Sequence, residues 1–152
     1  MIVALPDEAA TLALARRVYA CLPRACLVFL RGNLGAGKTA FVRGCLRAAG
    51  FEGPVKSPTF TLVEEYPLAD RILFHFDLYR LNTAEDLEWL GFRDYLRADA
   101  LCLVEWPERG AGKLPAADLE IRLTIEDGGR RAELSAATET GRGILARLTS
   151  GA

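Results

Sequence analysis

The segment at 26–49 contains the residues with the clearest chemistry. It reads CLVFLRGNLGAGKTAFVRGCLRAA, and its part GNLGAGKT at 32–39 fits the G-x-x-x-x-G-K-[ST] pattern of phosphate-binding loops (P-loops). Glycines allow positive φ angles and a close backbone approach, so that several N–H groups can point at one polyphosphate. Lys38 is expected to reach the β- and γ-phosphates, and the Thr39 hydroxyl to hold Mg²⁺. The nucleotide-contacting residues of this loop are expected to be Asn33, Leu34, Gly35, Ala36, Gly37, Lys38, Thr39 and Ala40.

Two elements must position this loop. The apolar run at 26–30 is typical of a strand that is buried on both faces. After Lys38, apolar residues recur at helical spacing as far as Leu46, and Gly50 is a suitable stop. The expected helix would add free N–H groups and the positive end of its dipole to the phosphate site. Strand before and helix after are the context that a functional P-loop requires.

Two carboxylates follow later apolar runs. Asp77 closes ILFHF at 72–76, and Glu105 closes ALCLV at 100–104. Ligands of open α/β sheets bind beyond the carboxyl ends of the strands, where a Mg²⁺–triphosphate site needs an acid. We expect Glu105 to bind the metal, because its strand is fully apolar, as a central strand should be. Asp77 would orient the attacking water or bind the metal through water. The alternative for each acid is a strand-end charge that faces solvent.

Two further residues have weaker signals. Thr59 lies in a loop that contains two prolines and resembles the threonine with which nucleotide switches sense the γ-phosphate and Mg²⁺, although a turn residue is the common alternative. Trp106 follows Glu105 and would pack over the nucleotide, over a partner or into the core. The chain contains no N/T-K-x-D element for reading guanine, which favours ATP over GTP.

The rest of the pattern predicts a single domain over residues 1–152. Its expected fold is α/β: a P-loop NTPase-type three-layer sandwich with a mixed, mainly parallel central sheet and a late antiparallel hairpin. The other expected strands span 2–5, 60–66, 119–125 and 130–136, with 60–66 and 72–76 paired as a hairpin; the other expected helices span 7–22, 83–90 and 139–148.

Composition restricts the possible classes of function. The 152 residues carry a formal net charge of −1, so no overall field draws the chain to nucleic acid or anionic lipid. The four cysteines form no C-x-x-C pair and are expected to be reduced, and a single histidine, His75, gives a zinc site or a Cys–His catalytic pair poor support. We find neither a signal peptide nor an apolar stretch of about 18 residues, and therefore expect a cytoplasmic protein without membrane contact.

With these residues in view, the chain resembles the TsaE (YjeE) family, the small ATPases of bacterial threonylcarbamoyladenosine tRNA modification. The resemblance runs nearly end to end, and HFDLYRL and LVEWPERG behind SPTFTLVEEY are its most specific parts. The matching segments are LPDEAAT at 5–11, GNLGAGKT at 32–39, VKSPTFTLVEEY at 55–66, HFDLYRL at 75–81, LEWLGFRDY at 87–95 and LVEWPERG at 103–110.

The resemblance implies slow Mg²⁺-dependent ATP hydrolysis by one P-loop domain. It implies TsaB and TsaD as partners, with TsaD transferring the threonylcarbamoyl group to the adenosine next to the tRNA anticodon and the ATPase resetting that complex between turnovers. Contact with tRNA would then be indirect. The implied roles are phosphate binding for Lys38, Mg²⁺ binding for Thr39 and Glu105, hydrolysis for Asp77, a switch-like loop around Thr59, a place beside the site for Trp106 and a nucleotide contact for Glu8.

Two positions depart from the common family loop GDLGAGKTT. Asn33 replaces an aspartate, which should ease repulsion of the phosphates, and Ala40 replaces a second threonine, which removes a hydroxyl. We expect nucleotide binding to be weaker by about 1 kcal/mol and the chemistry to be intact. Two other functions stay open: a small P-loop kinase, with Arg93, Arg97 or Arg109 in a closing lid, and a non-catalytic nucleotide-binding subunit.

Overall fold

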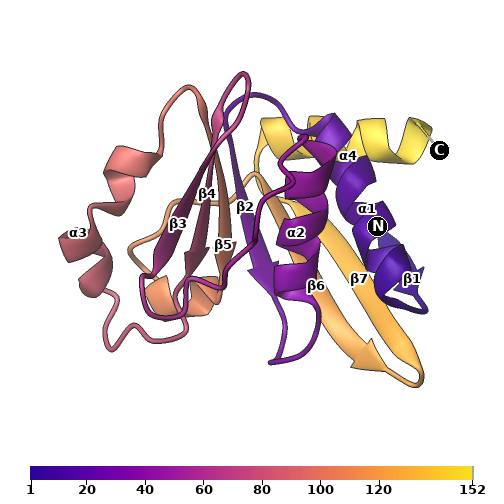
Figure 1. Cartoon of the computed structure of the whole chain (residues 1–152), viewed down its shortest axis with the longest axis horizontal. Coiled ribbons are helices and arrows are strands. Elements are labelled where there is room, and N and C mark those ends of the chain that lie inside the picture. Colours follow the sequence, from indigo (N-terminus) through magenta and orange to yellow (C-terminus); the bar gives the residue numbers. More distant parts are fainter. Residues whose placement is uncertain (152) are drawn as a thin grey trace.

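Helices lie against both faces of one twisted sheet (Figure 1). The computed structural model describes residues 1–151. In chain order the elements are β1 (Ile2–Leu5), α1 (Glu8–Cys21), β2 (Cys26–Arg31), α2 (Lys38–Ala48), β3 (Val63–Pro67), β4 (Ile72–Asp77), α3 (Asp86–Leu90), the 3-10 segment η1 (Phe92–Tyr95), β5 (Ala100–Glu105), the 3-10 segment η2 (Pro107–Gly110), β6 (Leu119–Glu126), β7 (Gly129–Ala136) and α4 (Glu139–Ser150).

The sheet is mixed. Its strand order is β1-β7-β6-β2-β5-β4-β3. The four central strands β6, β2, β5 and β4 run parallel to one another, and the edge pairs β1–β7, β6–β7 and β3–β4 are antiparallel. The predicted α/β fold with a mixed, mainly parallel sheet and a late hairpin is confirmed. The two strands that were expected to be buried, β2 and β5, lie side by side in the middle of the sheet.

The two faces of the sheet carry separate cores. On one face, alternate residues of β2 and β5 such as Leu30 and Leu103 pack under α1, α2 and α4, together with Phe41 of α2. On the other face, Phe76 of β4 packs against Phe92 of η1, with ring centroids 4.9 Å apart. Because side chains alternate between the two faces of a strand, every second strand residue faces the layer that contains α2, the helix that follows the P-loop.

Helix α2 lies against α1 because a glycine lets them approach. A Cβ on Gly44 would stand 2.6 Å from the Cβ of Ala15, closer than two carbons can lie. Helix α1 itself begins as predicted, since the Asp7 carboxylate accepts the backbone N–H of Ala10 at 2.8 Å. The start of α1 lies close to the P-loop.

Two expected element starts are wrong. The strand predicted from Phe60 begins at Val63, because Leu62 has a φ of 67° and its N–H donates to the carbonyl of Pro58, which closes a turn. The helix predicted from Thr83 begins at Asp86, whose carboxylate accepts the N–H of Thr83 and thus caps a preceding turn. Separately, no helix within residues 1–151 combines the length and the apolar character needed to cross a bilayer.

Candidate functional site

The P-loop between β2 and α2 adopts a backbone that needs its glycines. Gly32, Gly35 and Gly37 have φ angles of 150°, 81° and 105°. A Cβ on Gly32 would lie 2.6 Å from the backbone oxygen of Leu123 in β6, so the loop can press against that strand only without a side chain. Gly37 directly precedes the first turn of α2, and the free N–H groups of that turn face the loop.

A cavity of about 370 Å³ lies beside this loop. One wall is the P-loop and the start of α2. The opposite wall comes from the loop after α2 and from residues at and just after the ends of β4 and β5. The lining residues are Leu34, Gly35, Ala36, Gly37, Lys38, Thr39, Ala40, Ser57, Thr59, Asp77, Tyr79, Glu105 and Trp106.

Strand register brings the two acids to this cavity. In the parallel pair β4–β5, Asp77 stands opposite Glu105, and both side chains point to the layer that contains α2. Their residues are only 6% and 3% exposed. Glu105 accepts a hydrogen bond from the Thr39 hydroxyl at 3.2 Å. The two groups that we expect to bind the metal are therefore already in contact.

The Lys38 ammonium turns back onto its own loop. It donates hydrogen bonds to the carbonyl oxygens of Gly32 and Asn33, the latter at 3.2 Å, and lies 4.1 Å from the ring centroid of Trp106. Burial lowers the pKa of Lys38 from its ordinary value, although Glu105 acts in the opposite direction. A buried cation that holds only neutral partners would gain most from an anionic ligand in the cavity.

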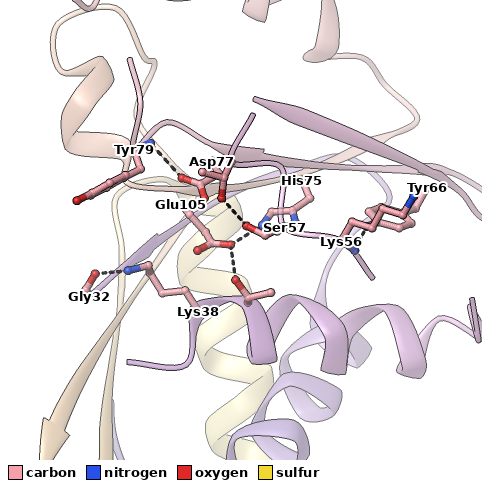
Figure 2. A network of polar contacts seen from close by, with 11 residues as sticks. Gly32, Lys38, Lys56, Ser57, Tyr66, His75, Asp77, Tyr79 and Glu105 are labelled. Carbon is pink, nitrogen blue, oxygen red and sulfur yellow. Dashed lines mark hydrogen bonds and ion pairs between the residues drawn. The ribbon is translucent and has the colours of Figure 1, made fainter. Parts of the chain in front are cut away.

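Asp77 lies at the tip of β4, and Figure 2 shows its carboxylate facing the same space as Glu105. One of its oxygens accepts the backbone N–H of Tyr79 at 3.0 Å. Burial raises the pKa of Asp77, and the charge of Glu105 raises it further, while the Tyr79 hydrogen bond opposes the shift. A carboxylate shifted in this way accepts a proton more readily than an exposed aspartate does.

Two predicted residues lie outside this cavity. Glu8 lines a neighbouring cavity of about 210 Å³ between the start of α1, the P-loop and the β6–β7 turn, and it forms an ion pair with Arg43. The two cavities adjoin, because Gly35 and Ala40 line both. Asn33 lines neither and contributes its backbone carbonyl to Lys38.

The sequence reasoning missed several residues of the site. Ser57 and Tyr79 line the main cavity, Arg130 donates to the carbonyl of Gly35 at 2.9 Å, and His75 contacts Glu105. Ser57 and Tyr79 each stand two positions from a predicted site residue, and His75 alternates with Asp77, so local spacing was an available signal for these three. Arg130 is far from the P-loop in sequence, and no local pattern indicated its contact.

The donor set fits magnesium better than a transition metal. Among residues 1–151, no group of three His, Cys, Asp or Glu side chains is arranged to hold a metal by itself. The Thr39 hydroxyl and the Glu105 carboxylate offer oxygen ligands, which Mg²⁺ prefers, and this ion usually completes its shell with phosphate oxygens and water. A metal at this place would therefore need a phosphate ligand.

Comparison with known proteins identifies the family of the chain. Residues 5–132 match the model of the family described as threonylcarbamoyl adenosine biosynthesis protein TsaE. The tRNA threonylcarbamoyladenosine biosynthesis protein TsaE of Haemophilus influenzae is 44% identical over 151 residues, covering 96% of each chain. The Bacillus subtilis protein of the same name is 37% identical over 116 residues, covering 76% of this chain and 71% of its own.

A solved structure shows the same fold. The crystal structure of Bacillus subtilis YdiB superposes with a TM-score of 0.86 at 27% identity, covering 99% of this chain and 95% of that one. The similarity therefore extends beyond the P-loop to the strands that carry the acids and to the late hairpin. The chain belongs to the TsaE family, whose members take part in tRNA threonylcarbamoyladenosine biosynthesis.

Proposed function

We propose that this chain is a Mg²⁺-dependent ATPase that serves tRNA threonylcarbamoyladenosine formation together with TsaB and TsaD. The observation that carries the proposal is one cavity in which Lys38 and Thr39 of the P-loop face Asp77 and Glu105. A cation, a hydroxyl, two acids and a row of backbone N–H groups are the parts from which phosphoryl-transfer sites are assembled. The family membership supplies the biological process.

Binding rests on the P-loop side. The N–H groups around Gly35 and Gly37 would receive the phosphates, and Lys38 would exchange its two carbonyl partners for phosphate oxygens. Thr39 and Glu105 would hold Mg²⁺, which when bound supplies positive charge that stabilises the charge developing on the phosphates. Glu8 and the adjoining cavity lie where the remainder of the nucleotide can be accommodated.

Hydrolysis rests on Asp77. One oxygen of its carboxylate accepts the Tyr79 N–H, and the carboxylate has further lone pairs with which to accept a proton from water. Because burial raises the pKa of Asp77, the ionised group is a better base than an ordinary aspartate. The attacking water would be held by Asp77 while Lys38 and the P-loop N–H groups stabilise the phosphate oxygens.

Coupling to partners rests on the loop that carries Ser57 and Thr59. The two hydroxyls lie 2.8 Å apart at the cavity wall, and neighbouring Phe60 is 85% exposed. A loop of this kind can change its contacts when the cavity contains a γ-phosphate and lose them after hydrolysis. A net charge of −1 favours tRNA contact through TsaB and TsaD rather than directly.

The test combines hydrolysis and association. Purified protein should release phosphate slowly from ATP with Mg²⁺, change its rate when TsaB and TsaD are added, and co-purify with them in a nucleotide-dependent manner. Lys38→Ala should lose these properties, whereas Lys113→Ala, a lysine paired with Glu88 away from the cavity, should retain them. Labelled phosphate on a metabolite would instead indicate a kinase, and tight ATP binding without turnover in the presence of both partners would indicate a non-catalytic subunit.

A further inference from the structure

The only histidine of the chain is buried behind the site. His75 lies on β4, two residues before Asp77 and on the same side of the strand, and it is 0% exposed. Its Nε2 is 2.5 Å from the Oε2 of Glu105 (Figure 2). Its Nδ1 is buried and has no hydrogen-bond partner among the described residues. The ring therefore makes one polar contact, and that contact is with the acid expected to hold the metal.

The surroundings of the ring indicate its tautomer. Nε2 faces a carboxylate oxygen and must carry the proton in order to donate to it. A proton on Nδ1 would leave a buried N–H without an acceptor, which costs more than an unpaired nitrogen lone pair in this apolar layer. The arrangement thus assigns the donor role to Nε2, and the hydrogen bond runs from His75 to the Glu105 carboxylate.

We propose that His75 is a positioning residue that fixes the carboxylate of Glu105 for Mg²⁺. Oε2 receives hydrogen bonds from both His75 and the Thr39 hydroxyl, which restrains the rotation of the carboxylate. The other oxygen, Oε1, is left to the metal or to a water on it. This inference rests on the proposed Mg²⁺–nucleotide function and assigns to His75 a role toward the metal but none toward the phosphates.

The physical reason is the freedom of a glutamate. Glu105 has three side-chain torsions, and a buried carboxylate without a donor would turn toward whichever N–H or ammonium it can reach, Lys38 included. A fixed donor behind the acid removes that freedom before the metal arrives. Residues that hold a ligand in this manner typically change metal affinity by about 10- to 100-fold.

Two substitutions separate positioning from simple packing. His75→Leu fills a similar volume but has no donor, whereas His75→Gln places an amide N–H near the position of Nε2. For His75→Leu, the Mg²⁺ concentration that gives half of the maximal nucleotide affinity should rise about tenfold. The affinity for ATP in EDTA should stay within about twofold, because the P-loop contacts are unchanged, and His75→Gln should restore most of the Mg²⁺ response. A packing role would instead lower both affinities, and His75→Gln would not restore them.

A single histidine also allows a direct spectroscopic test. In ¹⁵N-labelled wild-type protein, the imidazole should show a protonated Nε2 and an unprotonated Nδ1. Adding Mg²⁺ with a non-hydrolysable ATP analogue should shift the Nε2 signal, and Glu105→Gln should shift it without any ligand. A signal that responds to neither change would overturn the inference, and this measurement decides the matter even if His75→Leu does not fold.

The outcomes for the two proposals can be told apart. If wild-type protein gains no nucleotide affinity from Mg²⁺, the proposed function fails and the role of His75 fails with it. If wild-type protein gains affinity from Mg²⁺ and His75→Leu keeps the same Mg²⁺ dependence, the positioning role alone is refuted.

Discussion

The P-loop and the loop after α2, which lie on opposite sides of the main cavity, are built in different ways. The P-loop wall is pressed against β6 at Gly32, tied to β7 through Arg130 and continued by a helix whose inner face is fully buried. The opposite loop is irregular and largely exposed. Near the cavity it is held by the hydrogen bond from the Lys56 N–H to the Tyr66 hydroxyl at 3.2 Å and by the contact between the Ser57 and Thr59 hydroxyls.

We expect this difference to give the P-loop and the loop after α2 different functions. A wall with buried contacts and forced glycine geometry can hold phosphate without rearranging, which keeps the cost of binding low. A loop with few buried contacts, such as the one that carries Ser57 and Thr59, opens at low free energy, as segments that respond to ligands do. Substitutions in the P-loop should therefore change nucleotide affinity. Substitutions in the loop that carries Ser57 and Thr59 should change the response to the γ-phosphate. The predictions below test that division, from the largest expected effect to the smallest.

Lys38→Ala should weaken ATP binding by more than a hundredfold, because charge-assisted hydrogen bonds to the phosphates are lost at about 1.5–3 kcal/mol each. Hydrolysis should become undetectable. Titration calorimetry with ATP and Mg²⁺ measures the affinity, and Lys113→Ala is the matched control. A near-normal ATP affinity of Lys38→Ala would show that the P-loop does not contribute most of the binding free energy.

Asp77→Asn should reduce hydrolysis about a hundredfold and leave ATP affinity within about threefold, since general base catalysis contributes about 10²–10⁴ in rate. Single-turnover phosphate release measures the rate. Asp99→Asn, at an exposed ion pair with Arg97, is the control. Equal losses of affinity and rate would mean that Asp77 binds the nucleotide and does not serve hydrolysis.

The same variant has a pH signature. Because burial raises the pKa of Asp77, the folded state favours its neutral form, and ionisation costs stability above that raised pKa. Asp77→Asn should therefore raise the melting temperature at neutral pH. The gain should vanish as the pH falls well below the unfolded-state pKa of about 4, where the aspartate is neutral in both states. Wild-type hydrolysis should also decline on acidification at a higher pH than an ordinary aspartate would give. A gain that persists in acid would contradict the assigned cause.

Thr59→Ala should lower the hydrolysis rate about tenfold and weaken the effect of TsaB and TsaD on that rate. ADP affinity should stay unchanged, because Thr59 lies in the loop that we propose responds to the γ-phosphate. Thr61→Ala is the control, since Thr61 does not line the cavity and bonds to Glu64. Comparing ATP with ADP binding checks the result. An equal loss of ADP affinity would instead show that Thr59 contributes to nucleotide binding in general and does not respond to the γ-phosphate.

Ala40→Thr should tighten nucleotide binding about fivefold, or about 1 kcal/mol, because it adds a hydroxyl at a residue that borders both cavities. The measurement is ATP and ADP affinity, with Ala40→Val as the control of equal size. If threonine and valine have the same effect, the missing hydroxyl does not explain any difference in affinity.

The parts of the site that depend on local patterns could be predicted from the sequence. Gly32, Lys38 and Thr39 are fixed by the geometry of one loop, and Asp77 and Glu105 follow apolar runs whose length marks strand ends. The contact of His75 with Glu105 was not predicted, because it depends on which strands are neighbours and in which register.

Other features of the fold could not be predicted from the sequence for the same reason. Arg130 reaches Gly35 only because β6 lies beside the P-loop strand β2 and β7 pairs with β6, and the pairing of β1 with β7 joins the first strand to the last. Leu62 is typical of a strand by composition, yet its positive φ belongs to the turn from Pro58 that leads into β3. Long-range packing determined each of these features, and one-dimensional patterns do not contain it.

The most direct test of the central claim is a crystal structure with Mg²⁺ and a non-hydrolysable ATP analogue. We predict the triphosphate in the nest of P-loop N–H groups, the Lys38 ammonium moved from its carbonyl partners to phosphate oxygens, and Mg²⁺ bound by the Thr39 hydroxyl on the side of Glu105. A nucleotide bound elsewhere, or both Asp77 and Glu105 turned away from the phosphates, would contradict the account.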